Sequence, residues 1–95
     1  MTLLIIDDEP IWLAYCQRQG CDTCATLEEA LIKIETGQYK LVIVSSRLMA
    51  IVPELAQRAR VEVATGQPTT GEARDAFRAG AEDYFAKDFH RRLGD

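Results

Sequence analysis

Short, wholly apolar runs alternate along this chain with segments of helical periodicity. The clearest runs are residues 3–6 (LLII) and 41–44 (LVIV), and each stops abruptly at polar residues. Such runs are typical of strands that are buried on both faces of a parallel sheet. The chain has 95 residues, enough for one domain with one core, so a two-domain enzyme is excluded.

Helix start and stop signals separate the apolar runs. Pro10 predicts the start of a helix that reaches about Gln19, with Gly20 as its C-terminal stop. The next helix begins with a capping box of Thr26 and Glu29. One apolar helix face and a terminal glycine follow at Leu27, Ala30, Leu31, Ile34 and Gly37.

The second half of the chain continues the alternation. Residues 47–52 are ambiguous, and a short helix is expected over 53–59. Thr69 and Glu72 have capping-box spacing for a last helix. We expect this helix to end at Gly80 and to direct an apolar face inward at Ala73, Ala76 and Phe77.

Five strands alternate with four helices in this interpretation, with strands near residues 3–6, 21–25, 41–44, 61–65 and 83–87. This order predicts an α/β domain with a parallel sheet covered on both faces. In such sheets the functional crevice lies at the carboxyl ends of the strands. The candidate site residues at these ends are Asp7, Asp8, Ser45, Thr65 and Lys87.

The residue types at the strand ends point to a site for an anion and a divalent cation. Paired carboxylates such as Asp7 and Asp8 offer the hard oxygen ligands that magnesium prefers. The Lys87 ammonium can bind a phosphoryl oxygen, and the Thr65 hydroxyl can donate to the same group.

Four segments together resemble the receiver domain of bacterial response regulators: residues 3–10 (LLIIDDEP), 41–44 (LVIV), 65–66 (TG) and 80–89 (GAEDYFAKDF). The resemblance covers nearly the whole chain. It implies a CheY-like (flavodoxin-like) doubly wound sheet of five parallel strands in the order 2-1-3-4-5. It also implies that Thr65 and Tyr84 are the switch pair, and that Lys87 is the family's lysine.

The departures from the family are more informative than the matches. Receivers carry a phosphoryl-accepting aspartate at the end of the third strand, where this chain has Ser45. A serine hydroxyl is a weak nucleophile without a base and a poor magnesium ligand. Asp88 follows the lysine where the family usually has a proline in a cis bond. The resemblance therefore implies a degenerate pseudo-receiver that signals through protein–protein interaction without catalysis.

Two other functions stay open at this point. One is a receiver that still accepts a phosphoryl group, on Asp7 or Asp8. The other is a dimerisation module of a larger regulatory protein. The expected partners are accordingly another protein, an adjoining domain or a second copy.

The chain is also short beside the family. The first and third helices are expected to be shortened, and the fifth helix is missing. We expect a domain over residues 1–90, with 91–95 as a frayed tail, a linker or a truncated helix. Without a fifth helix, apolar surface near the first and fifth strands is exposed unless a partner or residues 89–93 cover it.

The acid pair is expected to bind magnesium only weakly. Asp8 is the direct ligand candidate and Asp7 would act through water, but two carboxylates without a third are a poor site. We therefore predict no bound metal at physiological magnesium, and no other cofactor. Lys87 is expected to form a salt bridge with Asp8 or Asp88 in preference to binding an anion.

Three further features have competing interpretations. Cys21 and Cys24 have CxxC spacing, but their expected place on a strand favours plain thiols over a redox or zinc site. Trp12 is either an interface residue or part of the core. Tyr84 and Phe89 are the other interface candidates.

The charge distribution excludes some classes of partner. The net charge is −4, and it comes from the first 45 residues, so no basic face for nucleic acid is expected. The N-terminus has no signal-peptide pattern, and no apolar run is long enough to span a bilayer. The expectation is a cytoplasmic protein that does not enter a membrane.

Overall fold

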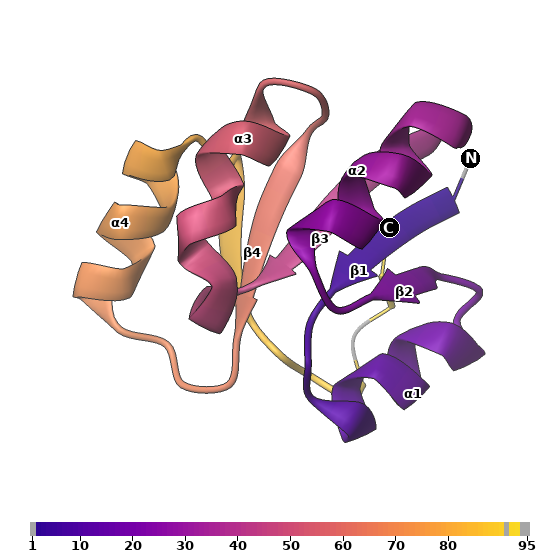
Figure 1. Cartoon of the computed structure of the whole chain (residues 1–95). Coiled ribbons are helices and arrows are strands. Elements are labelled where there is room, and N and C mark those ends of the chain that lie inside the picture. The colour runs from indigo at the N-terminus through magenta and orange to yellow at the C-terminus, as the bar shows by residue number, and fades with distance from the viewer. Residues whose placement is uncertain (1, 91, 94–95) are drawn as a thin grey trace.

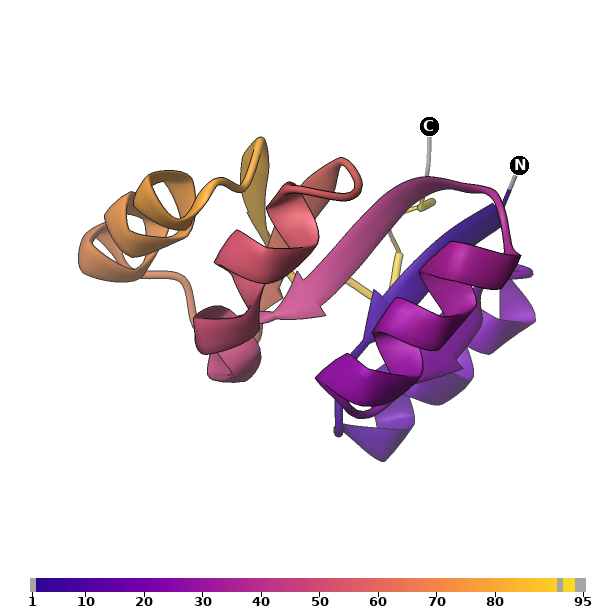
Figure 2. The ribbon, with the colours of Figure 1, turned by 45° about the horizontal axis from the view of Figure 1, so that its top comes forward.

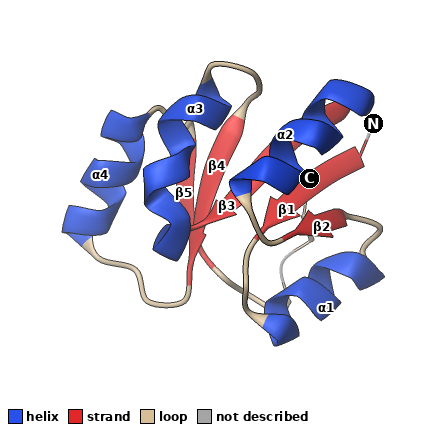
Figure 3. Ribbon diagram, in the orientation of Figure 1, coloured by secondary structure: helices blue, strands red, loops and turns tan. Residues whose placement is uncertain are grey.

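The computed structural model describes residues 2–90 and 92–93. Strands and helices alternate along the chain, as Figure 3 shows. The strands are β1 (Thr2–Ile6), β2 (Asp22–Cys24), β3 (Tyr39–Ser45), β4 (Val61–Thr65) and β5 (Asp83–Ala86). The helices are α1 (Pro10–Arg18), α2 (Leu27–Thr36), the 3₁₀ helix η1 (Ser46–Ile51), α3 (Val52–Ala56) and α4 (Thr70–Ala79).

All five strands pair in parallel in the order β2-β1-β3-β4-β5, which confirms the predicted sheet. In register, Ile6 lies beside Val44, Ser45 beside Ala64, and Thr65 beside Ala86. The strand ends therefore meet along one edge of the sheet. Figure 1 shows the sheet between its helices, with β3 in the middle.

The two faces of the sheet carry separate apolar clusters, because alternate strand residues point to opposite faces. One face holds Leu4, Ile6, Val42 and Val44, and packs against α2, α3 and α4. The other face, here called the α1 face, holds Ile5, Ile43 and Phe85 with Trp12 and Cys16 of α1. Burial of both faces explains why the central strands are apolar throughout.

The predicted helix signals are mostly confirmed. Thr26 and Thr69 accept hydrogen bonds from the backbone N–H groups of Glu29 and Glu72, at 3.2 and 3.1 Å. Gly20 and Gly80 follow α1 and α4 with φ of 86° and 115°. The ambiguous stretch is the 3₁₀ helix η1, which continues directly into α3, a helix of five residues.

One expectation about packing is wrong: Phe77 is 51% exposed and does not belong to the buried face of α4, where Ala76 is the fully buried residue. In the segment expected as a tail, Leu93 is only 9% exposed and packs on the α1 face. Its backbone N–H donates to Gln19 Oε1 at 2.8 Å. Residues 91, 94 and 95 lie outside the described part of the chain.

The segment after β5 covers part of the α1 face. Among residues 87–90 and 92–93 the structure has no helix. Figure 2 shows the segment after β5 returning past the sheet toward β1. Phe89 packs edge-on against the rings of Trp12 and Tyr15, with centroids 5.6 and 5.3 Å apart. The alternative in which the tail covers this face is therefore the one observed.

Candidate functional site

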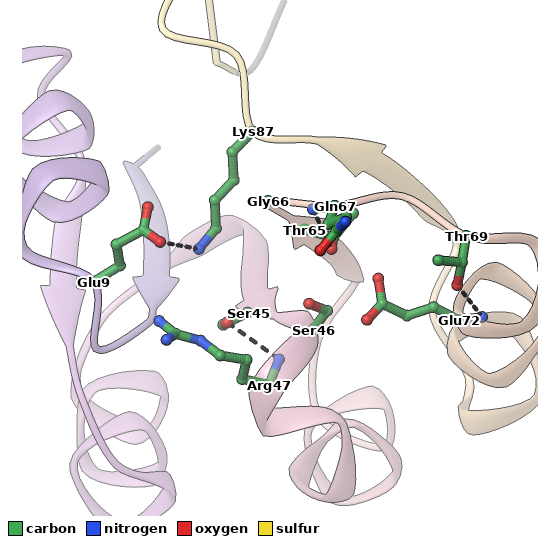
Figure 4. A pocket seen from close by; sticks show the side chains of 10 residues that line it. All are labelled: Glu9, Ser45, Ser46, Arg47, Thr65, Gly66, Gln67, Thr69, Glu72 and Lys87. Carbon is green, nitrogen blue, oxygen red and sulfur yellow. Dashed lines mark hydrogen bonds and ion pairs between the residues drawn. The ribbon is translucent and has the colours of Figure 1, made fainter.

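The carboxyl edge of the sheet encloses a cavity of about 450 Å³, shown in Figure 4. Its wall includes residues from four strand ends and from the first turn of α4: Glu9, Ser45, Ser46, Arg47, Thr65, Gly66, Gln67, Thr69, Glu72 and Lys87. Asp7 and Asp8 follow β1 and contact the cations of this wall. The structure thus brings all five predicted strand-end residues to one site.

Asp7 and Lys87 form a buried ion pair beside the cavity. Lys87 Nζ lies 2.8 Å from Asp7 Oδ2, and the two side chains are 5% and 1% exposed. The other oxygen of Asp7, Oδ1, accepts from the backbone N–H groups of Asp8 and Glu9, at 2.7 and 3.1 Å. Lys87 Nζ also lies 3.7 Å from Glu9 Oε2. Asp7 is therefore fixed by groups of the chain itself.

The predicted salt bridge of Lys87 exists, but its predicted partners are wrong. Asp7 takes the place expected of Asp8 or Asp88. Strand periodicity explains the choice, since Asp7 continues the alternation of Ile5 and Lys87 continues that of Phe85. Both side chains therefore extend on the α1 face, where Lys87 Nζ also lies 5.9 Å from the centroid of the Trp12 ring.

Arg47 is a functional candidate that the sequence analysis missed. Its Nη2 lies 2.5 Å from Asp8 Oδ1 and 3.4 Å from Asp7 Oδ1, so one nitrogen faces both carboxylates. The side chains of Arg47 and Asp8 are each 56% exposed. The available signal was the position of Arg47, which follows Ser45 by two residues and so lies at the same sheet edge.

Ser45 and Thr65 close the ends of their strands with hydrogen bonds to their own loops. Both residues are buried. Ser45 Oγ accepts from the backbone N–H of Arg47 at 3.2 Å, which starts η1 and positions Arg47. Thr65 Oγ1 accepts from the backbone N–H of Gln67 at 3.1 Å. The Lys87 N–H donates to the Thr65 carbonyl at 2.7 Å and joins β4 to the lysine.

Tyr84 is held by α4. Its hydroxyl donates to Glu72 Oε1 at 2.5 Å and accepts from the backbone N–H of Thr69 at 3.1 Å. Burial and this bond to Glu72 raise the pKa of Tyr84. Burial alone would raise the pKa of Glu72, but hydrogen bonds from Tyr84, Thr65 and Ser46 outweigh it and lower that pKa. Glu72, expected only as a helix cap, therefore links the predicted switch pair.

The charges around the cavity do not favour an added anion. Four carboxylates, on Asp7, Asp8, Glu9 and Glu72, face two cations, Lys87 and Arg47, which leaves two negative charges in excess. A phosphoryl group would add more negative charge at short range.

The donor set also does not fit the magnesium ion that the receiver resemblance implies. Among the described residues, no group of three or more His, Cys, Asp or Glu side chains is placed to hold a metal. Magnesium needs near-octahedral oxygen ligands. The oxygens of Asp7 and Asp8 instead face the Arg47 guanidinium and the Lys87 ammonium. No metal-dependent step is therefore assigned to this site.

The cysteines are buried thiols, as the sequence analysis favoured. Cys16, Cys21 and Cys24 are all free and buried. Cys21 packs on the α1 face and Cys24 on the opposite face, so the CxxC pair is split by the sheet. Burial is the main cause that raises the pKa of all three thiols. The pKa of Cys24 rises to about 11 and that of Cys16 to about 12.

Of the predicted interface residues, Trp12 belongs to the core. It is fully buried, and its ring stacks on Tyr15 with centroids 5.6 Å apart. Of the two alternatives left open for Trp12, the structure therefore has the core position and not the surface contact. Phe89 is 43% exposed, and Tyr84 is half-buried.

Comparisons with known proteins give matches in structure only. No protein-family model matches the chain, and no curated protein does. An orphan response regulator of H. pylori has 26% identity and a TM-score of 0.74, with 96% of this chain and 86% of that chain covered. An atypical orphan response regulator described as having a phosphorylation-independent regulatory mechanism has 26% identity and a TM-score of 0.67, with 92% and 82% covered.

A third match is a response regulator from Burkholderia pseudomallei, solved with a phosphorylated aspartic acid, a calcium ion and citrate. It has 24% identity and a TM-score of 0.70, and the match covers 90% of this chain. This chain spans 59% of that protein, and 23% of another matched chain. Receiver folds thus occur within longer proteins.

The fold and the strand-end residues define a class: doubly wound α/β domains with an acid pair and a lysine at the carboxyl edge. The structural matches confirm the predicted fold: the chain has the CheY-like fold of response-regulator receiver domains. No helix in the described residues is long and apolar enough to cross a membrane.

Proposed function

We propose that this domain is a pseudo-receiver that signals through protein–protein interaction and is not phosphorylated at Ser45. The observation that carries the proposal is the internal neutralisation of the acid pair. Asp7 is bound by the buried Lys87, and Asp8 by Arg47. In a phosphorylating receiver these charges would serve a metal ion and a phosphoryl group.

The residue at the acceptor position supports the same function. Ser45 is 1% exposed, and its oxygen accepts from the Arg47 backbone N–H. No carboxylate or imidazole contact that could remove its proton is found for Ser45 among the described residues. A neutral serine without such a base is a weak nucleophile. The excess negative charge of the site further disfavours a phosphoryl donor.

The output of such a domain is expected at its surface, through an adjoining domain or a separate protein. Exposed apolar side chains suited to contacts are Phe77 on α4 and Phe89 in the tail. Hydrogen bonds to Glu72 and Thr69 hold the Tyr84 hydroxyl against the start of α4. We infer that partners recognise the single state in which Tyr84 is held.

Intact-mass measurement after incubation with acetyl phosphate and magnesium tests the proposal. The expected result is an unchanged mass. A hydroxylamine-labile phosphoryl group mapped to Asp7 or Asp8 would instead establish a relocated acceptor. A hydroxylamine-resistant group lost in Ser45→Ala would establish phosphorylation of Ser45 and would also overturn the proposal.

Light scattering separates the pseudo-receiver from a dimerisation module. A mass that stays monomeric over a wide concentration range is expected if the domain acts on a different protein. A concentration-dependent dimer would favour the dimerisation function, and substitution of the exposed Phe77 by Ala would then test the face involved.

A further inference from the structure

Arg47 lies where a cation would otherwise bridge the acid pair. Its Nη2 is within hydrogen-bonding distance of Asp8 Oδ1, at 2.5 Å, and lies 3.4 Å from Asp7 Oδ1. One nitrogen of a positively charged guanidinium thus faces one oxygen of each carboxylate. A divalent ion bound by both side chains would need the same space.

The local fold places Arg47 there. β3 ends at Ser45, whose side chain accepts from the Arg47 N–H and fixes the first turn of η1. This turn lies beside the loop after β1, because β1 and β3 are neighbours in the sheet. The guanidinium therefore joins the β1–α1 loop to the β3–α3 connection.

The charge of this bridge is permanent, but its position is not locked. A guanidinium stays protonated at all physiological pH values. Arg47 and Asp8 are both 56% exposed, and exposed ion pairs are weak. Lys87, in contrast, is 5% exposed and stays with Asp7. Arg47 is thus the cation of the site that can leave without disrupting the buried pair.

We propose that Arg47 is a built-in counter-ion that replaces the divalent cation of this site and excludes it. The role rests on the proposed function, since an acid pair neutralised from within needs no metal to hold its loops together. Removal of the Arg47 guanidinium leaves Asp8 Oδ1 without its cation and uncovers the side of Asp7 that Arg47 faces, so that a divalent ion can approach. Arg47 therefore makes the site independent of magnesium.

Thermal unfolding with magnesium alone, without a phosphoryl donor, tests this role. Wild-type protein is expected to show no change in Tm in millimolar magnesium. Arg47→Met is expected to unfold at a slightly lower temperature without metal. Its Tm rises by about 5 °C or more once free magnesium reaches roughly ten times the dissociation constant. Manganese binding, followed by electron paramagnetic resonance, gives a second readout.

Matched variants identify the cause of any shift. Arg60→Met removes another exposed arginine ion pair, with Glu82 at 2.8 Å, and is expected to leave the protein insensitive to magnesium. Asp8→Asn added to Arg47→Met is expected to abolish the magnesium response. Arg47→Gln keeps hydrogen-bond donors and removes the charge, so it repeats the test if Arg47→Met folds poorly.

Two results would overturn the role of Arg47: no magnesium response in either Arg47 variant, or a wild-type response as large as theirs. Neither result depends on phosphorylation. A covalent phosphoryl group on the wild-type protein would overturn the proposed function separately, so the two failures are distinguishable.

Discussion

At the residue scale, the ion pair of Lys87 and Asp7 organises the site. The sequence placed both residues at the sheet edge, because strand ends are readable from apolar runs. The predicted partner of Lys87 was wrong, because the sequence alone does not say which of the carboxylates of Asp7, Asp8 and Asp88 lies next to the ammonium. The alternation of side chains along a strand would have predicted the right partner, because Asp7 and Lys87 lie on the same face of the sheet as Ile5 and Phe85.

Loss of this lysine is expected to destabilise the fold strongly. Lys87→Met leaves Asp7 Oδ2 buried without its cation, and only the more distant Arg47, 3.4 Å from Oδ1, still faces the carboxylate. Loss of one partner costs about 3–5 kcal/mol in comparable buried pairs. Urea unfolding measures the change. Asp7→Asn combined with Lys87→Met removes the unpaired charge while an amide oxygen still accepts the two loop N–H groups, so it should recover part of the loss. A loss below about 1 kcal/mol for Lys87→Met would contradict the burial of the pair.

The Glu72–Tyr84 contact predicts a specific pH dependence. The folded pKa of Glu72 lies below its ordinary value of 4.5, because hydrogen bonds to the carboxylate outweigh burial. Its stabilising contribution is therefore complete above about pH 4.5 and is lost as the pH falls through the folded pKa. Wild type and Glu72→Gln should differ in Tm at pH 7 and converge near pH 3.

Tyr84→Phe is the matched control for this pH dependence. It removes the hydroxyl that donates to Glu72 Oε1. In the Tyr84→Phe background, the difference in Tm between Glu72 and Gln at position 72 should therefore change less between pH 7 and pH 3. A gap between wild type and Glu72→Gln that stays constant from pH 7 to pH 3 would show that Glu72 does not stabilise the fold through its charge.

At the element scale, helix boundaries were the most predictable features and the 3₁₀ helix the least. Capping threonines and terminal glycines are local signals, so α2 and α4 could be predicted from the sequence alone. η1 has no such signal, since it depends on the Ser45 cap and on packing against the sheet. The inner face of α4 was predicted with Phe77, but its buried contacts are made by the small residues Ala76 and Ala79.

Gly80 at the end of α4 provides an element-scale prediction. Its φ is 115°, and a Cβ there would lie 2.9 Å from Ala56 Cβ of α3. Gly80→Ala is therefore expected to cost at least about 1–2 kcal/mol of stability. Gly66→Ala is the control, because nothing lies within 4 Å of its Cβ position. Equal unfolding midpoints for the two variants would refute the strain at Gly80.

At the scale of the whole molecule, the two faces of the sheet are covered by different kinds of segment. Helices α2, α3 and α4 cover one face, while α1 and the tail cover the other. The sequence suggested a frayed end because residues 88–92 are mostly polar. Residues 89–93 were one of the two alternatives for covering this face, but Phe89 and Leu93 are too few apolar residues for the sequence to choose between the tail and a partner.

Leu93 therefore tests whether the tail belongs to the domain. Leu93→Ala is expected to lower the free energy of unfolding by about 2 kcal/mol, because a side chain that is 9% exposed loses its apolar contacts. Phe77→Ala, at 51% exposure, should change it by less than about 0.5 kcal/mol. An insensitive Leu93→Ala would mean that the tail contributes nothing to the α1 face.

The central claim is that the acid pair Asp7 and Asp8 is neutralised by the domain's own cations, and that the site does not switch in response to a phosphoryl group. Amide chemical shifts of the wild-type protein, recorded before and after addition of magnesium and acetyl phosphate, test it most directly. Thr65, Tyr84 and Lys87 report on the site, since the Lys87 N–H donates to the Thr65 carbonyl at 2.7 Å. Unchanged shifts at these residues are predicted. Concerted shifts that reverse when the phosphoryl group is hydrolysed would contradict the claim.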